Sequence, residues 1–239
     1  MQIFLLGLFF CLSVIYIRFD FGGGNTDKVF ITITTFFFSI FSGFFITRQG
    51  TRYTKIREII STFDGKMSSI YRVSGNIAVS IQEKIGKVIQ NHYNKILETK
   101  SWDYHFVNKS STITDIHNIL EVDIGGNKQE SLRNQSVGRV LANLNDCQVL
   151  RKNMVMLSQE RIPEFQWFLI FFFVFILLAT ISVIPSYGFL LGSILKSAFV
   201  VSIISVVFIL YNLDNLHLFE NFIGENSAKD VVDIIKGSK

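Results

Sequence analysis

The sequence predicts an all-α membrane protein with four transmembrane helices and a polar helical block in the middle of the chain. Apolar residues gather in two pairs of segments, residues 3–46 and 165–211, and a more polar block of over a hundred residues lies between them. Of 239 residues, 49% are hydrophobic and 25 are Phe, well above the usage of soluble domains. A helix of about 20 apolar residues crosses the roughly 30 Å of bilayer hydrocarbon, so each segment of these pairs is a candidate span.

The first pair predicts a transmembrane hairpin in residues 1–47, with spans at about residues 3–21 and 29–47. Its first apolar run, residues 3–17, is long enough only if Phe19 and Phe21 join it and Arg18 reaches the lipid headgroups. A cleaved signal peptide is the alternative for this run. No Lys or Arg precedes the run and no small-x-small site follows it, which favours an uncleaved span.

The second pair predicts a transmembrane hairpin in residues 165–213, with spans at about residues 165–184 and 188–211 and a tail at 214–239. Lys196 is the one charge well inside these runs. An intramembrane charge is a candidate functional residue, here one that attracts an anion. The alternative is that its long side chain extends to the outer headgroups, because Lys196 lies only about 12 Å along the helix from Gly188.

Basic residues predict how the chain is oriented. Seventeen of the 23 Lys and Arg residues lie between Arg48 and Glu164, and Arg48, Arg52 and Lys55 follow the second span directly. Because positive residues concentrate on the cytoplasmic side of a membrane, the central domain, residues 48–164, is expected in the cytoplasm. Four crossings then place both termini there, in a multi-pass protein of the inner or plasma membrane.

Apolar stripes at spacings of three and four predict the helices of the central domain. The stripe from Ile56 to Ile96 predicts one long helix that continues the second span to Lys100, with a bend near Asp64-Gly65. A second stripe, Val140 to Leu157, predicts a helix that returns to the third span. Shorter helices are expected at residues 113–122 and 228–235. These apolar faces pack either within one chain, as a helical hairpin, or on neighbouring subunits.

Several short motifs carry a resemblance to a known family. They stand in a fixed order along the predicted topology: Arg52-Tyr53, Ile70-Tyr71-Arg72, Tyr93 with Trp102, Arg161 with Pro163, and Leu213-Asp214. With these motifs the chain resembles the uncharacterised bacterial four-span proteins described as bestrophin-like. It departs from them at Ser101, where a Glu is usual, and at Asn215-Leu216, where a Pro-Phe usually follows, which leaves the roles of Trp102 and the tail open.

The resemblance extends more distantly to the bestrophins proper, with which this chain shares the topology and an aromatic second helix. Those proteins are pentameric anion channels whose second helix lines a pore narrowed by hydrophobic residues. The resemblance therefore implies a lipid-embedded homo-oligomer, with a pentamer favoured, and small anions as permeant ions.

The second span offers candidate pore residues. Phe37, Phe41 and Phe45 recur every four residues, so their rings lie along one side of a helix and are candidates for a hydrophobic neck. Arg48 and Arg52 follow one and two turns later and are candidates for a basic collar that concentrates anions. The alternatives are that the Phe rings contact lipid or the other Phe-rich spans, and that both Arg are ordinary cytoplasmic anchors.

No motif predicts catalysis, a cofactor, a metal or nucleic-acid binding. The four His residues have no ligand partners at metal-binding spacing, and we find no nucleophile elbow, phosphate loop or pair of catalytic carboxylates. Charges of both signs alternate along the central block, which is typical of a solvated helical surface. Cys11 and Cys147 lie on different sides of a water boundary and are not expected to pair.

Two functional hypotheses follow from the sequence. The first is an oligomeric anion channel with a Phe-lined neck on the second span. The second is a non-conducting membrane scaffold whose cytoplasmic helices bind a protein partner, since the two stripes offer more apolar surface than one hairpin covers.

Overall fold

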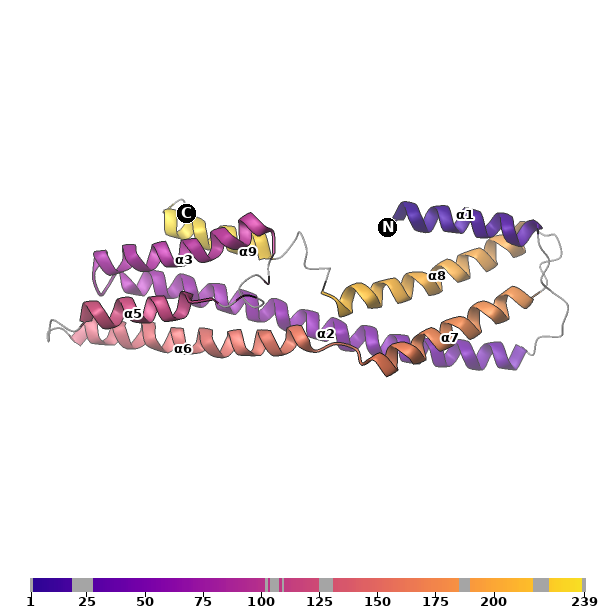
Figure 1. The fold of residues 1–239 in the computed structure, drawn as a ribbon, viewed down its shortest axis with the longest axis horizontal. Helices are drawn as coiled ribbons and strands as arrows, with labels where there is room; N and C mark the ends of the chain where they lie inside the picture. Colours follow the sequence, from indigo (N-terminus) through magenta and orange to yellow (C-terminus); the bar gives the residue numbers. More distant parts are fainter. Residues whose placement is uncertain are drawn as a thin grey trace. The chain divides into compact units, whose positions relative to one another are not determined.

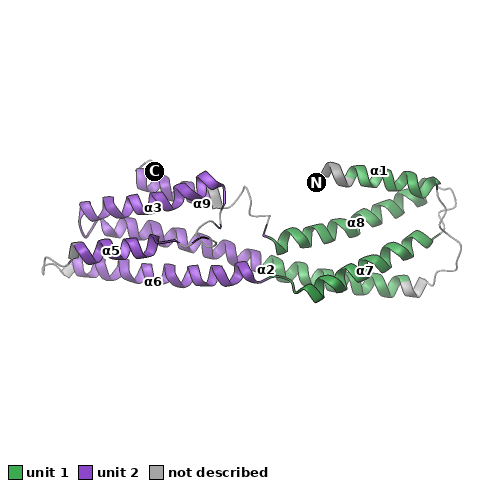
Figure 2. Cartoon of the chain, in the orientation of Figure 1, with its two compact units in different colours: residues 1–51, 161–215 green, residues 52–160, 216–239 purple. Residues whose placement is uncertain are grey.

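The computed structural model describes residues 2–18, 28–101, 103, 108, 110–124, 131–184, 190–216 and 224–237. Every regular element in this part of the chain is an α-helix, which confirms the predicted all-α class. The chain divides into two compact units, coloured separately in Figure 2. Unit 1 comprises residues 1–51 and 161–215, and unit 2 comprises residues 52–160 and 216–239.

Unit 1 contains the apolar helices. They are α1 (Gln2–Arg18), the first part of α2 (Lys28–Ser74), α7 (Glu164–Val183) and α8 (Leu190–Asp214). Helices α2, α7 and α8 are each long and apolar enough to cross a membrane, as expected of an integral membrane protein. Helix α1 is apolar but shorter, with 17 residues. Three of the four predicted spans are therefore supported by length and composition, and the first stays a prediction.

Close packing of α1 on α8 holds part of unit 1 together, and Figure 1 shows the two helices side by side. Ser193 and Ser197 of α8 are fully buried, and the Ser197 hydroxyl donates to the carbonyl of Ser193 at 2.9 Å. Small residues let helix backbones approach closely where no water drives association. The buried cluster at the centre of the unit consists of Tyr16, Phe38, Leu177, Ile181, Val200 and Ile203.

Unit 2 is a helical bundle with its own apolar core. It contains the rest of α2, α3 (Val79–Thr99), α5 (Thr112–Ile124), α6 (Ser131–Gln159) and α9 (Gly224–Lys236). Helices α5, α6 and α9 confirm the three helices predicted at residues 113–122, 140–157 and 228–235. Side chains from all five helices form one cluster, which includes Met67, Ile85, Ile116, Leu144 and Val231.

The prediction of one helix from the second span to Lys100 is wrong. Helix α2 passes Gly65 without interruption and ends at Ser74, and a turn at residues 75–78 separates it from α3. In this turn the amides of Asn76 and Ile77 donate to the carbonyls of Val73 and Ser74, both at 3.0 Å. The apolar stripe is continuous in sequence, but α3 folds back along α2. The apolar residues of the two helices then lie in one buried cluster. Mutual burial stabilises this hairpin more than an exposed stripe would.

The helical extension of the third span is likewise a separate helix. Helix α6 ends at Gln159 and α7 begins at Glu164, with Pro163 as the N-terminal cap residue of α7. A proline has no amide hydrogen and disfavours helical geometry in the residue before it, so a helix begins readily after it but does not run through it.

Candidate functional site

One side of α2 is left uncovered by the rest of the chain. In unit 1 this side presents Phe36, Ile40 and Phe44, which are 61%, 50% and 59% exposed. At about 100° per residue, the exposed residues Thr47 and Thr51 follow on the same side within unit 1 and lie with these three within about 80° of arc. We call this set the uncovered face of α2: Phe36, Ile40, Phe44, Thr47 and Thr51.

The predicted neck residues are covered to different extents, since Phe37 is 44% exposed, Phe41 is half-buried and Phe45 is buried. Phe45 is 3% exposed and packs with Ile170 and Leu210. Phe41 is half-buried and stacks on Phe45 and on Phe173 of α7, with ring centroids 6.5 Å and 5.5 Å apart. Phe37 also stacks on Phe173, at 6.2 Å. The three rings therefore form a stack that fixes α2 against α7.

The two predicted collar residues are in different surroundings. Arg48 is exposed, whereas Arg52 is buried. The Arg52 guanidinium donates from Nε to the carbonyl of Leu157 at 2.7 Å and from Nη2 to the carbonyl of Ser158 at 2.9 Å. These carbonyls belong to the last turn of α6, where a helix lacks its own donors and its dipole favours a cation. Arg52 thus serves as a cap for α6.

Lys196 is half-buried in the second turn of α8. Its ammonium group donates to the carbonyl of Ile184, the C-terminal cap residue of α7, and lies 5.3 Å from the centroid of the Tyr16 ring. A helix C-terminus and an aromatic face both stabilise a positive charge. The lysine therefore connects α1, α7 and α8.

Asp214, the acidic residue of the Leu213-Asp214 motif, is buried at the end of α8. Its carboxylate accepts hydrogen bonds from the amide of Ile162 at 2.7 Å and from Nε1 of Trp167 at 3.3 Å. The neighbouring Arg161 and Pro163 are exposed. One carboxylate therefore fixes the chain where it enters α7, which gives this motif a structural role.

A second buried carboxylate, Asp64, lies at the centre of unit 2. It accepts a hydrogen bond from the Tyr93 hydroxyl at 2.6 Å and another from the hydroxyl of Ser227, so it joins α2, α3 and α9. Burial raises the pKa of Asp64 from 3.8 to about 6, although both hydrogen bonds oppose the shift. Burial, and then the adjacent Asp64 carboxylate, raise the pKa of Tyr93 well above its usual value.

The other motif residues have packing roles or lie on the surface. The Tyr71 hydroxyl donates to the carbonyl of Ile235 in α9 at 3.2 Å. Tyr53 is half-buried against a cluster that contains Ile56, and Arg72 is exposed. Trp102 lies outside the described residues.

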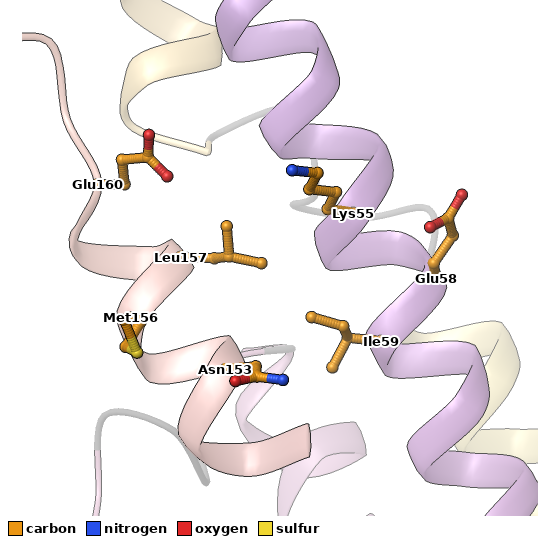
Figure 3. A pocket seen from close by; sticks show the side chains of 7 residues that line it. All are labelled: Lys55, Glu58, Ile59, Asn153, Met156, Leu157 and Glu160. Atoms are coloured by element: carbon orange, nitrogen blue, oxygen red, sulfur yellow. The ribbon is translucent and has the colours of Figure 1, made fainter. Parts of the chain in front are cut away.

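A groove of about 560 Å³ separates α2 from α6 in unit 2 (Figure 3). Figure 3 shows the Lys55 ammonium directed into the space between the helices. The groove has an apolar floor with a charged rim, and it is lined by Lys55, Glu58, Ile59, Asn153, Met156, Leu157 and Glu160.

Two features of the site were missed by the sequence analysis. The position of Asp64 on the apolar side of α2, between Ile60 and Met67, signals a buried carboxylate, but Ser227 has no local signal. The uncovered face could not be separated from the Phe37–Phe41–Phe45 stripe by sequence, because the whole span is apolar. Only the contact with Phe173 distinguishes them.

Comparison with solved structures shows the fold. The chain is similar to a mutant of a bacterial bestrophin homologue from Klebsiella pneumoniae, with a TM-score of 0.64 and 13% sequence identity over 99% of each chain. No protein-family model matches the sequence. No curated protein matches it either. The predicted distant bestrophin-like resemblance is thereby confirmed at the level of the fold.

Proposed function

We propose that this chain is one subunit of a homo-oligomeric membrane channel for small anions, with the uncovered face of α2 lining the pore. The observation that carries the proposal is this face itself, a row of exposed residues on one side of α2 that the other helices of unit 1 leave uncovered. The bestrophin fold supports the same function, because the resemblance drawn from the sequence implies a pentameric anion channel lined by the second helix.

The uncovered face changes character along its length in the way a conduction pathway requires. Phe36, Ile40 and Phe44 offer an apolar constriction, which can close a pore by excluding water. Thr47 and Thr51 follow. The Thr47 hydroxyl can donate a hydrogen bond to an anion, whereas the Thr51 hydroxyl donates to the carbonyl of Thr47 at 3.0 Å. We therefore propose that Phe36, Ile40 and Phe44 form the neck. They lie about 100° around the helix axis from Phe37, Phe41 and Phe45, the stripe predicted from the sequence.

In this proposal the predicted Phe stripe and one residue of the predicted basic collar support the pore helix and do not line the pore. The stack of Phe41, Phe45 and Phe173 holds α2 against α7, and Arg52 fixes the end of α6. Arg48, which is exposed beside the uncovered face, is the collar residue that we assign to concentrating anions near the cytoplasmic end of the neck. The orientation with unit 2 in the cytoplasm, the pentameric number and the absence of enzymatic activity belong to the same proposal.

The scaffold hypothesis loses most of its support in this structure. It relied on apolar stripes with nothing to cover them, yet residues of both stripes, such as Ile85 and Leu144, are buried in the core of unit 2. Four large apolar side chains of α6 stay exposed: Leu132, Leu141, Val149 and Met156, at 66%, 40%, 52% and 63%. A patch of this size suits contact between copies of the chain as well as contact with another protein.

The proposal is tested by reconstituting the purified protein in liposomes and measuring chloride flux, with the oligomeric state determined in detergent. We expect an oligomer that supports flux above empty vesicles. Phe36→Ala and Phe44→Ala should raise the flux, because each removes a ring from the constriction. Phe175→Ala is the matched control, since Phe175 is 71% exposed on α7 and lies outside the proposed pore.

Two results would contradict the channel. One is a folded oligomer with no flux above empty vesicles, and the other is a monomer as the stable species. If Phe175→Ala alters flux as strongly as Phe36→Ala, the uncovered face of α2 is not the pore lining.

A further inference from the structure

We infer that α9 docks reversibly on the other helices of unit 2 and that the Asp64 carboxyl controls this docking, because α9 covers the carboxyl and is held most tightly when it is protonated. The inference concerns unit 2 alone and goes beyond the proposed channel. It makes α9 a helix that responds to the pH around unit 2. Its basis is the pair of contacts that α9 makes with α2, one near each of its ends.

Helix α9 packs along α3, as Figure 1 shows, and buries its apolar side. The buried residues on this side are Ala228, Val231 and Val232. Near the end of α9, the Tyr71 hydroxyl of α2 donates to the carbonyl of Ile235 at 3.2 Å. Gly86 of α3 makes room for this contact, since a Cβ atom there would lie 3.0 Å from the Tyr71 ring and 3.5 Å from the Ile235 side chain. An isolated helix of 13 residues is marginal in water, so α9 needs this packing to stay helical.

At its other end, α9 covers a buried carboxylate. Asp64 is 7% exposed, and its two oxygens accept hydrogen bonds from Tyr93 of α3 at 2.6 Å and from Ser227 of α9. Both donors are neutral, and within the described residues no cation, Lys66 and Arg151 included, pairs with Asp64. A buried carboxylate without a cation is costly to keep charged, so burial raises the pKa of Asp64 to about 6 although both hydrogen bonds oppose the shift.

The ionisable groups that face Asp64 from α3 and α6 do not titrate with it. Burial, and then the Asp64 carboxylate, raise the pKa of Tyr93 well above its usual value. Burial also raises the pKa of the Cys147 thiol on α6 to about 12. Both groups therefore stay neutral over the range in which Asp64 titrates. Lys66 and Asp146 neutralise each other in an ion pair between α2 and α6, with Nζ and Oδ2 2.8 Å apart.

Other ionisable residues of this core and of α9 remain when Asp64 is replaced. His92 of α3 packs on the Tyr93 ring, with ring centroids 5.0 Å apart, and its Nδ1 shares a hydrogen bond with the Thr112 hydroxyl at 2.9 Å. Four ionisable residues of α9 lie about 60–180° around the helix axis from Ser227: Lys229, Asp230, Asp233 and Lys236. Since all of them are kept in Asp64→Asn, this substitution isolates the contribution of Asp64.

The docked and undocked states should bind the Asp64 proton with different strengths. Without α9, one carboxylate oxygen loses its cover and meets water, so the pKa of Asp64 falls toward its ordinary value of 3.8. Docking is therefore strongest when the carboxyl is protonated in both states, weakens as pH rises toward about 6, and changes little above that. A protonated Asp64 still bonds to Ser227, because a hydroxyl group can accept as well as donate.

Hydrogen exchange of the full chain in detergent tests this inference, with protection factors of the α9 and α6 amides measured at pH 4.5 and 7.5. In the wild type, α9 protection should fall about tenfold between these pH values, the change produced when undocking lowers the pKa by about one unit. At pH 7.5 it should be lower than the protection of α6, because α9 leaves while the rest of the unit stays folded. Asp64→Asn cannot titrate, so its α9 protection should change by less than about twofold.

A second variant and a control accompany this measurement. Ser227→Ala keeps the titrating carboxyl and removes its donor on α9. A hydrogen bond to a charged acceptor is stronger than one to a neutral acid, so the fall in α9 protection should be larger than in the wild type. Asp115→Asn is the matched control, since this carboxylate of α5 also accepts from a serine hydroxyl, that of Ser111, at 2.7 Å. It should leave the fall unchanged.

Several results would overturn the inference. They are a wild type with equal α9 protection at both pH values, a fall that persists in Asp64→Asn, and a fall that is lost in Asp115→Asn. Equal protection of α9 and α6 at pH 7.5 would have the same consequence, because α9 would then leave only when all of unit 2 unfolds. If Asp64→Asn does not fold, Ser227→Ala decides, and an unchanged fall in that variant counts against the inference.

Discussion

The two units of this chain bury their apolar residues to very different extents. In unit 1, large apolar side chains such as Phe168 and Phe175 are 65% and 71% exposed, and most of the exposed large apolar residues in the described chain belong to this unit. In unit 2, Ile85 and Ile89 are 0% exposed, at the centre of a core that five helices share. The difference reflects the solvent each unit meets, because hydrocarbon does not drive apolar side chains inward and water does.

The same contrast appears in the hydrogen bonds of buried polar groups. In unit 1, the Thr180 hydroxyl donates to the carbonyl of Ile176 in its own helix at 2.6 Å. In hydrocarbon no water can accept this hydrogen bond, so a polar side chain bonds to the backbone of its own helix. In unit 2, Tyr93 and Asp64 bond between helices. Asp214 is an exception within unit 1, since its carboxylate binds the amide of Ile162 across 52 residues of sequence.

The largest expected difference in unfolding free energy is between two Phe→Ala substitutions on α2, one in each unit. Phe63 is 5% exposed in the core of unit 2 and stacks on His92 at 5.9 Å, so Phe63→Ala should cost about 3–5 kcal/mol of unfolding free energy. Phe36→Ala, on the uncovered face, should cost less than about 1 kcal/mol. Hydrogen exchange measures both effects, at the α3 amides of unit 2 for Phe63→Ala and at the α2 amides of unit 1 for Phe36→Ala. An equal loss of protection in the two variants would contradict the difference between the units.

A smaller effect should follow the titration of Asp64. Its pKa is raised from 3.8 to about 6, so the folded protein binds this proton more tightly than the unfolded chain does. The stability of unit 2 should therefore fall as pH rises from about 4 to about 6, by about 3 kcal/mol at most. Asp64→Asn keeps an acceptor for Tyr93 and cannot titrate, so its stability should depend less on pH over this range.

Chemical or thermal unfolding in detergent at pH 4.5, 5.5 and 7 provides the measurement, with the wild type and Asp64→Asn compared at each pH. Parallel pH profiles in the two proteins would show that Asp64 does not supply the dependence.

The smallest effect should be in unit 1, at Asp214. Asp214→Asn exchanges a charged acceptor for a neutral one at the amide of Ile162, which should cost about 1–2 kcal/mol. Faster hydrogen exchange at residues 162–167, with unit 2 unchanged, is the expected result. Asp146→Asn is a suitable control, because Asp146 is 50% exposed in its ion pair with Lys66. If unit 2 lost protection in Asp214→Asn, the carboxylate would not act on unit 1 alone.

The predictions from sequence succeeded where the pattern depended on neighbours within a few turns. Helices α5, α6 and α9 followed from apolar spacing, and the all-α class followed from the apolar runs. The continuation to Lys100 failed, because a stripe with a period of three to four is the same in one straight helix as in two helices that fold face to face. Gly75 and Asn76, at the turn, were the available signal.

By itself, the sequence determined that this chain is built from helices, that its apolar runs suit a bilayer, and which stripes become buried. Helical periodicity and hydrophobicity are local properties, so they can be obtained from residue order. Tertiary structure alone decided that Arg52 caps α6, that Asp64 and Ser227 meet, and that Phe36 rather than Phe41 is uncovered. These outcomes depend on which helix packs against which side of α2. The sequence of a span that is apolar on all sides does not indicate which side will be covered.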